Sequence, residues 1–557
     1  MDIISIEESK VKLPTINYKG VYLHSRYNPE KEAESFVEKK YKPADVQLLI
    51  GYGLGYIYRE LVKKKSPEEK IIIIDPLVNE INLIDGIKDL ILLKEINETA
   101  LKNFFNEHIS VVDSLNIIIS INYDKVLKEN LKLILIMLEE KVKSNEIVEN
   151  TIQFFSSQWH ENYIKNLKYA ISDKPVGKLF NKFNCPIVIA SGGPSLTKQL
   201  PLLKKYRDKF ILIAAGTTIN SLLKNTIRPD FVISVDGGEI NRNHFENLHI
   251  EDFPIIYCPT VHYGIRQKFK DGYYFLPLIE SDLKYHYSRF SKNDIDIIMD
   301  GSSVANYAYN LALLMTTGPV AMIGQDLAYT SGLTHADGNL NKKNILDESE
   351  FSRKLIEREG YFGEPVLTDN VFLQMRDIFE VVLQSNNAIN RSYNCTEGGL
   401  KINAFTQVSF ANFLNKFANE TVHITKESNI STEAQTKVLK KELTKDVLNI
   451  KELIKLFEKA LNFLEKNNSE IEYEDYTIVK LDEIDTQIQT IIKDTSLEFA
   501  FNLINLRLFK YFKIDDTLRR EQKFKISFEQ NKYMYGEMLN VSKNSLILIE
   551  KEIDYIA

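Results

Sequence analysis

Cysteine is scarce in this chain, which has only three cysteines in 557 residues, Cys185, Cys258 and Cys395. Their wide separation fits neither a disulfide framework nor the paired spacing of a structural zinc site. Long apolar runs are also lacking, because stretches such as IIIID at 71–75 are far shorter than the roughly 20 residues of a membrane helix. The first residues, MDIISIEESKVKLP, lack the basic stretch followed by an apolar segment that marks secretion. We therefore expect a cytoplasmic protein with no membrane partner.

An excess of basic charge is missing as well. The chain has 70 Lys and Arg against 77 Asp and Glu, which gives a net charge of −7, so nucleic acid is not an expected partner. A chain of 557 residues is too long for one hydrophobic core, and several domains are expected. The sequence does not indicate an oligomeric state.

The chain does contain three regions of different pattern. Short apolar strands alternate with helical stretches between about residues 46 and 125 (VQLLI, KIIIID, SLNIIIS), and a helical stretch continues to about residue 170. The alternation restarts with PIVIA, FILIAAG, FVISVDG, PIIYC, YYFLP and PVAMIGQD, and it predicts βαβ units with parallel sheets. We expect an α/β multidomain protein with an N-terminal Rossmann-like domain (1–170), a central Rossmann-like domain (171–430) and an α-helical C-terminal domain (431–557).

The C-terminal region is nearly free of glycine and proline after Ser431. Apolar residues recur there at steps of three and four, the pattern of an amphipathic helix: Leu439, Leu443, Val447, Ile450, Ile454, Phe457, Leu461 and Leu464. Two interpretations stay open for these helices. They pack on one another as a bundle, or they also offer a docking surface to a partner protein.

A first glycine loop follows the strand VQLLI. It carries Gly51, Gly53 and Gly55, and Asp75 ends the next strand, 20 residues after Gly55. Strand, glycine loop, helix, strand and acid is the arrangement that binds a dinucleotide or an S-adenosyl cofactor, with the acid on a ribose hydroxyl. The same pattern also suits a tight turn in a Rossmann-like domain that binds no cofactor, and the sequence leaves both interpretations open.

A second glycine loop ends the strand IVIA, in the stretch SGGPSL at 191–196. Gly192 and Gly193 allow the backbone to approach a ligand closely, Ser191 and Ser195 offer hydroxyl groups, and amides at a helix start favour an anion. The loop is not a P-loop, since no Gly-Lys-Ser/Thr follows. It predicts a site for the phosphate of a nucleotide.

Other strands of the central region, among them the one predicted from IDIIMD at 295–300, also end in small polar or acidic residues. In a doubly wound sheet, ligands bind at the carboxyl ends of the strands. Together these strand ends predict one cleft for a nucleotide sugar or a similar ligand, formed with the second glycine loop by Gly216, Thr217, Thr218, Asp236, Gly237, Gly238, Gly301, Ser302, Ser303, Gly324 and Asp326.

A polar segment, GQDLAYTSGLTHADG at 324–338, follows the last of these strands. It holds Asp326, Tyr329, His335 and Asp337, and its glycines would let it order over a bound substrate as a lid. Histidine is the side chain best suited to proton transfer near neutral pH, so His335 is a candidate for a catalytic role.

These motifs resemble those of the motility accessory factor (Maf) proteins, which are bacterial flagellin glycosyltransferases. The resemblance covers most of residues 20–420. It rests on LHSRYNPEKEAESF at 23–36, SGGPSL, RPDFVISVDGG at 228–238, GQDLAYTSGLTHADG and NCTEGGLKI at 394–402. The central region is also similar to bacterial sialyltransferases that use CMP-sialic acid and have one Rossmann-like domain. The shared pattern is the Gly-Pro-Ser loop, a hydroxyl pair before a helix, and Gly-x-Asp followed by a tyrosine and a second aromatic residue.

The resemblance implies an enzyme that transfers a nonulosonic acid, pseudaminic or legionaminic acid, from its CMP-activated form to Ser or Thr hydroxyls of flagellin, as flagellum assembly and motility require. Loop amides and Ser195 would hold the nucleotide, Tyr329 and His335 would donate to the departing phosphate, and Asp236 and Glu239 are alternative bases. The second aromatic position is His335 where the sialyltransferases have tyrosine, and their separate histidine base has no clear counterpart. No cofactor and no metal are expected. The residues expected to bind the donor are Ser191, Gly192, Gly193, Ser195, Gly216, Thr217, Gly237, Ser302, Ser303, Asp326 and Glu397.

Three rival interpretations remain. An archaeal 6-hydroxymethylpterin diphosphokinase family resembles the same central motifs, and in such an enzyme Asp236 and Asp326 would hold Mg²⁺ for ATP. A non-catalytic flagellin-binding chaperone would keep the fold without the chemistry. A methyltransferase would act through the segment from Gly51 to Asp75.

Overall fold

The structure is a computed structural model that describes residues 4–78, 90–110, 113–248, 250, 253–339, 343–344, 354–424, 433–466, 475–501, 504, 508, 512 and 519–556. The chain forms two compact units, one made by Met1–Thr151 and a larger one that begins at Ile152. The boundary falls within the long helix α6 (Lys128–Asn166). Among the described helices, none is long and apolar enough to cross a membrane.

The smaller unit contains a parallel four-stranded sheet in the order β6-β5-β4-β7. Its apolar strands were predicted from VQLLI, KIIIID and SLNIIIS, and β4, β5 and β7 confirm them. A three-stranded antiparallel sheet precedes it. The elements are β1 (Ile4–Glu8), β2 (Pro14–Tyr18), β3 (Val21–Tyr22), α1 (Pro29–Lys40), β4 (Val46–Ile50), α2 (Tyr56–Lys64), β5 (Lys70–Ile74), β6 (Ile91–Leu93), α4 (Glu98–His108), β7 (Leu115–Ile119) and α5 (Tyr123–Val126).

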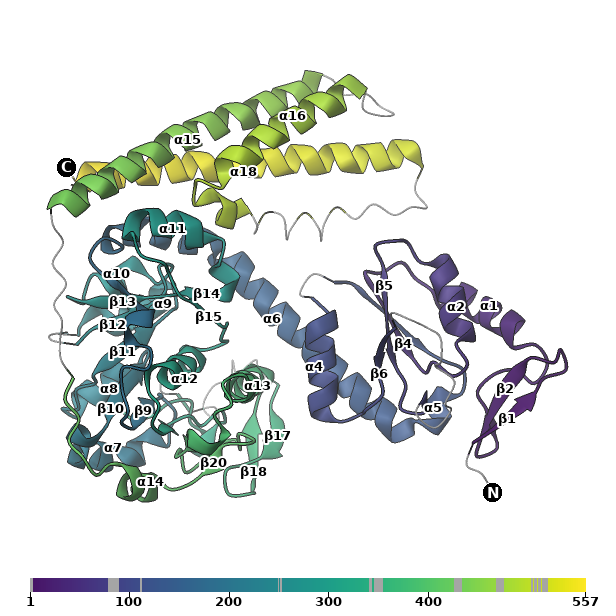
Figure 1. Ribbon diagram of the computed structural model, residues 1–557, viewed down its shortest axis with the longest axis horizontal. Helices are drawn as coiled ribbons and strands as arrows, with labels where there is room; N and C mark the ends of the chain where they lie inside the picture. Colours follow the sequence, from purple (N-terminus) through teal and green to yellow (C-terminus); the bar gives the residue numbers. More distant parts are fainter. Residues whose placement is uncertain are drawn as a thin grey trace. The chain divides into compact units, whose positions relative to one another are not determined.

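The larger unit is built on a nine-stranded sheet in the order β20-β19-β16-β9-β10-β11-β12-β13-β8. Figure 1 labels β9 to β13 of this sheet in succession. Every adjacent pair is parallel, so all strands end at one edge. The predicted α/β class is confirmed. The strands are β8 (Lys174–Pro175), β9 (Ile187–Ala190), β10 (Ile211–Ala215), β11 (Phe231–Ser234), β12 (Ile255–Tyr257), β13 (Gly272–Tyr274), β16 (Val320–Ile323), β19 (Ser392–Asn394) and β20 (Thr406–Gln407).

Helices cover both faces of this sheet because successive side chains of each strand point to opposite faces. Val188 and Ala190 of β9 pack in one core with side chains of α7 to α11 and α14, while Ile187 and Ile189 pack in another with α12 and α13. The sheet is therefore doubly wound. The helices are α7 (Leu196–Lys205), α8 (Thr218–Lys224), α9 (Glu239–Glu246), α10 (Tyr263–Arg266), α11 (Leu283–Ser291), α12 (Val304–Met315), α13 (Asn370–Ser385) and α14 (Phe410–Phe417).

One predicted strand does not join the main sheet. The segment IDIIMD supplies only β15 (Ile297–Ile298), which pairs with β14 (Leu276–Pro277) in a separate two-stranded sheet. β15 ends at Ile298 because the chain turns near Asp300 toward the N-terminus of α12. β17 (Ile356–Glu359) and β18 (Pro365–Thr368) form an antiparallel hairpin apart from the main sheet.

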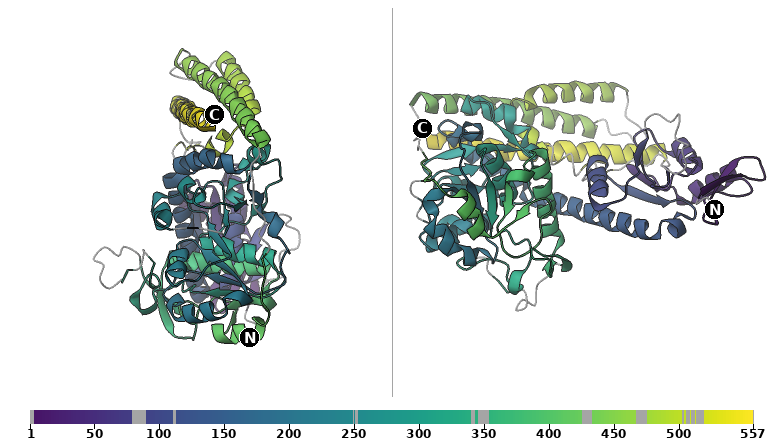
Figure 2. Two further views of the ribbon diagram at one scale, coloured as in Figure 1. Left: turned by 90° about the vertical axis from the view of Figure 1, so that its left-hand side faces the viewer. Right: turned by 60° about the horizontal axis from the view of Figure 1, so that its bottom comes forward.

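The C-terminal region contains the helices α15 (Glu433–Lys466), α16 (Asp475–Ile492) and α18 (Arg520–Ile556). α15 and α18 lie side by side (Figures 1 and 2), and the pairs Lys451–Glu550 and Lys532–Glu465 show that they run antiparallel. Below them, His286 of α11 lies 2.8 Å from Asp446 of α15. The contacts place these helices in one unit with the nine-stranded sheet, while the division at residues 170 and 430 stays a prediction.

Candidate functional site

The order of the nine strands marks a crevice between β9 and β16. From β9 the chain adds β10 to β13 on one side, and it later returns to place β16 and β19 on the other side. This reversal is the topological switch point, where ligands bind in open α/β sheets. The loop SGGPS follows β9 and the segment GQD follows β16, so the two strongest motifs of the central region meet at this crevice.

The loop at 191–195 is closely packed against the end of β16. The amide of Gly193 donates to the carbonyl oxygen of Gly324 at 2.8 Å. A Cβ added at Gly193 would lie 2.1 Å from Asp326 Oδ2 and 2.5 Å from the carbonyl oxygen of Gly324. Glycine is therefore required here because the two loops interlock, and not only to admit a ligand.

Asp326 holds these loops together from a buried position. Its carboxylate accepts hydrogen bonds from the Ser195 hydroxyl and the Thr330 hydroxyl, both at 2.7 Å, and from the Ser195 amide. Burial raises the pKa of the carboxyl group, although these hydrogen bonds oppose the rise. Its carbonyl oxygen accepts from the amide of Leu400 at 2.7 Å. Asp326 thus joins the segments that follow β9, β16 and β19.

The amides of Gly193 and Ser195 and the Ser195 hydroxyl, all predicted to face a phosphate, are thus engaged within the protein. Ser191 differs from them, because its buried hydroxyl has no hydrogen-bond partner among the described residues. Glu397, predicted to bind the donor, accepts the amide of Phe410 at 2.8 Å at the start of α14.

The lid segment lies over the glycine loop. The amide of Ala336 donates to the carbonyl oxygen of Gly192 at 2.9 Å, and a Cβ added at Gly192 would lie 3.7 Å from His335 Cδ2. Asn339, which the sequence analysis did not single out, donates to the Thr217 hydroxyl at 3.1 Å. The structure therefore brings Gly192, Thr217 and His335 together from three separate segments.

The hydroxyl pair before α12 lies beside the end of β10. A Cβ added at Gly216 would lie 3.7–3.9 Å from the side chain of Val304, the first residue of α12. Ser303 caps this helix, since its hydroxyl accepts from the amide of Asn306 at 3.3 Å, and the Ser302 hydroxyl lies 3.4 Å from the side chain of Asn306. The N-terminus of a 12-residue helix thus adds its partial positive charge to the strand-end edge.

Tyr329 is buried, and its hydroxyl donates to Asp369 at 2.6 Å. Asp369 in turn caps α13 by accepting the amide of Phe372. In this arrangement the hydroxyl proton of Tyr329 is directed to a carboxylate. Its predicted donation to a phosphate would require Tyr329 to leave Asp369.

A second polar group lies at the ends of β11 and β12, where Asp236 and Glu239 were candidate bases. Asp236 is exposed and accepts the amide of Gly238 at 2.8 Å. Glu239 Oε2 accepts from Arg242 at 3.0 Å, and its Oε1 lies 3.0 Å from Nε2 of His262. The hydrogen bond from Arg242, with that from His262, lowers the pKa of Glu239.

His262 was missed by the sequence analysis, because nothing in CPTVH marks it as a functional residue. Its Nδ1 accepts the amide of Gly264 at 3.0 Å, so the ring proton is on Nε2, where it faces Glu239. The side chain of His262 is 2% exposed and that of Glu239 is 53% exposed. His262 therefore positions Glu239 and is itself shielded from a ligand.

The backbone amides of the first glycine loop form hydrogen bonds within the smaller unit. The carboxylate of Asp75, which is fully buried, accepts from the amides of Tyr52 and Gly53 at 2.7 and 3.1 Å and from the Tyr123 hydroxyl at 2.7 Å. A Cβ added at Gly51 would lie 2.5 Å from the Tyr123 ring. The acid that would bind a ribose is turned into the loop, and the geometry favours a tight turn that binds no nucleotide.

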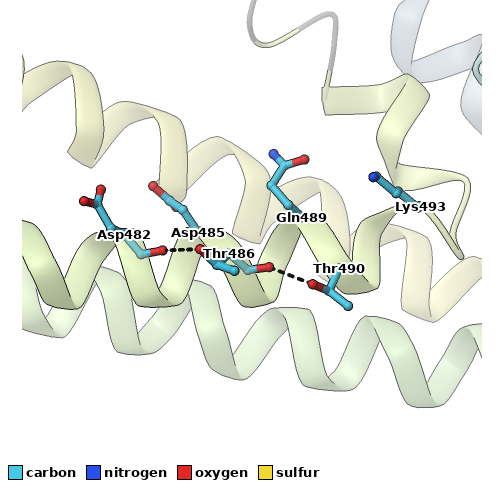
Figure 3. Close-up of a pocket in the computed structure, with 6 residues that line it drawn as sticks. All are labelled: Asp482, Asp485, Thr486, Gln489, Thr490 and Lys493. Atoms are coloured by element: carbon cyan, nitrogen blue, oxygen red, sulfur yellow. Dashed lines mark hydrogen bonds between the residues drawn. The ribbon is translucent and has the colours of Figure 1, made fainter.

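A hollow of about 580 Å³ elsewhere in the larger unit lies along α16 (Figure 3). Five of the six residues that line it belong to this helix and the sixth, Lys493, follows it directly: Asp482, Asp485, Thr486, Gln489, Thr490 and Lys493. The hydroxyls of Thr486 and Thr490 donate to carbonyl oxygens of their own helix. Groups from several elements do not converge there, so the strand-end edge of the nine-stranded sheet is the better candidate site.

One of the comparisons with known proteins falls on the region that contains the end of β9. Residues 161–332 match a family described as 6-hydroxymethylpterin diphosphokinase MptE-like. A solved structure of the Maf glycosyltransferase from Magnetospirillum magneticum AMB-1 superposes with a TM-score of 0.60 at 14% identity, covering 99% of this chain and 93% of that one. An uncharacterised protein of Treponema pallidum (strain Nichols) is 32% identical over 83 residues, which is 15% of this chain and 39% of that protein. The chain therefore has the fold of a Maf glycosyltransferase over nearly its whole length.

Proposed function

We propose that this protein is a glycosyltransferase that moves a nonulosonic acid, pseudaminic or legionaminic acid, from a CMP-activated donor to Ser or Thr hydroxyls of flagellin. The observation that carries the proposal is the meeting of Gly192, Thr217 and His335 at the switch point of the sheet. The likeness to the Maf glycosyltransferase over 99% of the chain supports it.

The donor would bind across the carboxyl ends of β9 and β10. Its phosphate is negatively charged, and the groups available there are the Ser191 hydroxyl, the Thr217 hydroxyl and the N-terminus of α12 with Ser302 and Ser303. Oriented hydroxyls and a helix N-terminus favour an anion. Gly193, Ser195 and Asp326 would not contact the donor directly, because they are engaged in holding these loops in place.

The chemistry requires charge to grow on the departing phosphate while a hydroxyl of the acceptor loses a proton. His335 lies beside Gly192 and is the residue we assign to protonating or hydrogen-bonding the departing CMP. Glu239 is the residue we assign to the acceptor side, because its exposed carboxylate is oriented by His262 and Arg242. Glu239 is ionised at neutral pH and accepts the proton as the new bond forms. No metal is part of this scheme.

The diphosphokinase alternative is supported by one of the comparisons. The match of residues 161–332 to the MptE-like family favours a diphosphokinase that uses ATP and Mg²⁺. That reading assigns Asp236 and Asp326 to the metal. Asp326 is buried and bonded to Ser195 and Thr330, so it would have to release both before it could bind Mg²⁺.

Isothermal titration of the full chain with CMP, CDP and ATP, each with and without Mg²⁺, separates these functions. The transferase predicts CMP binding without Mg²⁺. Binding of ATP only, and only with Mg²⁺, would favour the diphosphokinase. Binding of no nucleotide, together with binding of flagellin, would favour a chaperone that retains only the fold.

A further inference from the structure

A cleft of about 530 Å³ lies between α7 and α8, beside the candidate site. The buried side chains of Leu200 and Ile227 form an apolar floor, and the exposed Pro201 also lines the cleft. Lys204 at the end of α7 and Lys224 at the end of α8 stand at its rim, and both are exposed. Nothing in the proposed donor chemistry uses this cleft.

The cleft and the candidate site share one wall. Thr197 and Asp337 both line the cleft, and the amide of Asp337 donates to the Thr197 hydroxyl at 3.1 Å. Thr197 is two residues beyond Ser195, and Asp337 is two residues beyond His335. The segment at 335–339 thus has the glycine loop on one side and the cleft on the other.

The charge at the rim is suited to a negatively charged ligand. The ammonium group of Lys204 donates to the Thr226 hydroxyl at 2.7 Å. Over the part of the chain that the structure describes, neither Lys204 nor Lys224 has a carboxylate within ion-pair distance. Among the described residues that line the cleft, Asp337 is the one acid, so these residues carry a net positive charge beside an apolar floor.

A transferase that acts on a protein needs such a second contact. A Ser or Thr hydroxyl carries little information by itself, so selection of the acceptor depends on groups away from the reacting atom. An extended peptide whose hydroxyl lies between the donor held at His335 and the carboxylate of Glu239 would continue past Thr197 and Asp337 into the cleft.

We propose that this cleft holds an acidic segment of the acceptor protein, with an apolar side chain on the floor and a carboxylate near Lys204 and Lys224. This inference rests on the proposed function, because only a protein-directed transferase has a peptide acceptor. The positive charge of Lys204 and Lys224 and the wall shared with the candidate site together support this occupant over a free small molecule.

The test compares the double variant Lys204→Glu/Lys224→Glu with the control Lys205→Glu, which reverses a neighbouring charge outside the cleft. Transfer to flagellin is measured at saturating CMP-sugar donor. We expect the KM for flagellin to rise at least about tenfold in the double variant, with kcat changed less than KM, and to stay near the wild-type value in the control. The wild-type KM should also rise with salt, because exposed charges are screened.

A charge-reversal experiment tests whether Lys204 and Lys224 contact the acceptor peptide itself. Synthetic peptides with an acceptor Ser and an acidic segment beside it should bind the wild type better than the double variant, as measured by fluorescence anisotropy, and the same peptides with lysine in place of the acids should show the reverse order. Equal KM values in the wild type and the double variant would overturn the cleft assignment alone. Failure of the wild type to bind CMP or to transfer any sugar would overturn the proposed function and the cleft assignment with it.

Discussion

At the scale of single residues, the candidate site depends on a few contacts at the ends of strands. Gly193, Asp326 and Ser195 form one interlocked group, in which the glycine admits the carboxylate and the carboxylate holds the serine. Motif spacing identified all three, but their predicted task was contact with the nucleotide. The structure gives them the task of holding two loops together.

Replacing Gly193 with alanine should therefore damage stability and nucleotide binding together. The added Cβ would meet the backbone of Gly324 as well as the side chain of Asp326, so one loop must move, at a cost of about 1–3 kcal/mol. Chemical denaturation and CMP titration measure the two effects. Gly536→Ala is the control, since nothing lies within 4 Å of a Cβ added there, and it should leave CMP affinity unchanged. A Gly193→Ala protein with wild-type stability would contradict the interlocked arrangement.

His262 gives a prediction about positioning. His262→Ala removes the Nε2–H that faces Glu239, so the pKa of Glu239 should rise and the acid limb of the pH–rate profile should move to higher pH. His262→Gln keeps an N–H donor near the same place and should restore most of kcat. If alanine and glutamine lower kcat equally without moving the profile, His262 is merely structural.

His24 gives a prediction about acid stability in the smaller unit. Burial lowers its pKa from 6.5 to about 4, and its Nε2 accepts the amide of Leu54 at 2.9 Å. Between pH 6.5 and 4 the unfolded chain binds a proton that the folded unit does not bind, so stability falls as the pH drops through this window, by up to about 3 kcal/mol.

His24→Gln keeps an acceptor for Leu54 and removes the titration. Hydrogen exchange of the β4 amides at pH 7 and pH 4.5, corrected for intrinsic rates, should show a smaller loss of protection in the variant than in the wild type. The same loss of protection in both proteins would show that His24 does not control this dependence.

At the scale of helices and strands, the second half of α6 fixes the loops that follow β11 and β12. The amide group of Asn162 donates to the carbonyl oxygens of Gly237 and Thr260, and that of Asn166 donates to those of Pro259 and Val261. Both asparagines are buried. The helix thus supports the loops from which Glu239 and His262 project.

Asn166→Ala should destabilise the larger unit by about 2–4 kcal/mol, because two buried carbonyl oxygens lose their partner. Urea denaturation followed by the fluorescence of the one tryptophan, Trp159, measures the change. The control Asn145→Ala, on the part of α6 that belongs to the smaller unit, removes one exposed hydrogen bond and should change the Trp159 transition by less than about 1 kcal/mol. Equal losses in the two variants would contradict the support that we assign to Asn166.

Much of the element level was predictable from the sequence, since buried parallel strands are continuous apolar runs such as IVIA and ILIAA. The segment IDIIMD misled because an apolar run does not show which strand it pairs with. His262 and Asn339 were not predictable, because their partners, Glu239 and Thr217, are 23 and 122 residues away. The first glycine loop matches the dinucleotide-binding motif, but the motif does not show that the carboxylate of Asp75 turns inward to the Tyr123 hydroxyl.

At the scale of the whole molecule, the residues with a proposed role in transfer all belong to the larger unit. In the proposed scheme the donor binds at the ends of β9, β10 and β16, and Glu239, the base for the acceptor hydroxyl, follows β11. The helices α15, α16 and α18 belong to the same unit and are joined to it through His286 and Arg289 of α11. Whether these helices also dock flagellin stays a prediction.

The most direct test of the central claim is the intact mass of flagellin after incubation with the protein and CMP-pseudaminic or CMP-legionaminic acid. A transferase of the proposed kind should increase this mass by whole nonulosonic acid residues and release one CMP for each, and His335→Ala should give much weaker modification. Unchanged flagellin with both donors, from a protein shown to be folded and able to bind flagellin, would contradict the account.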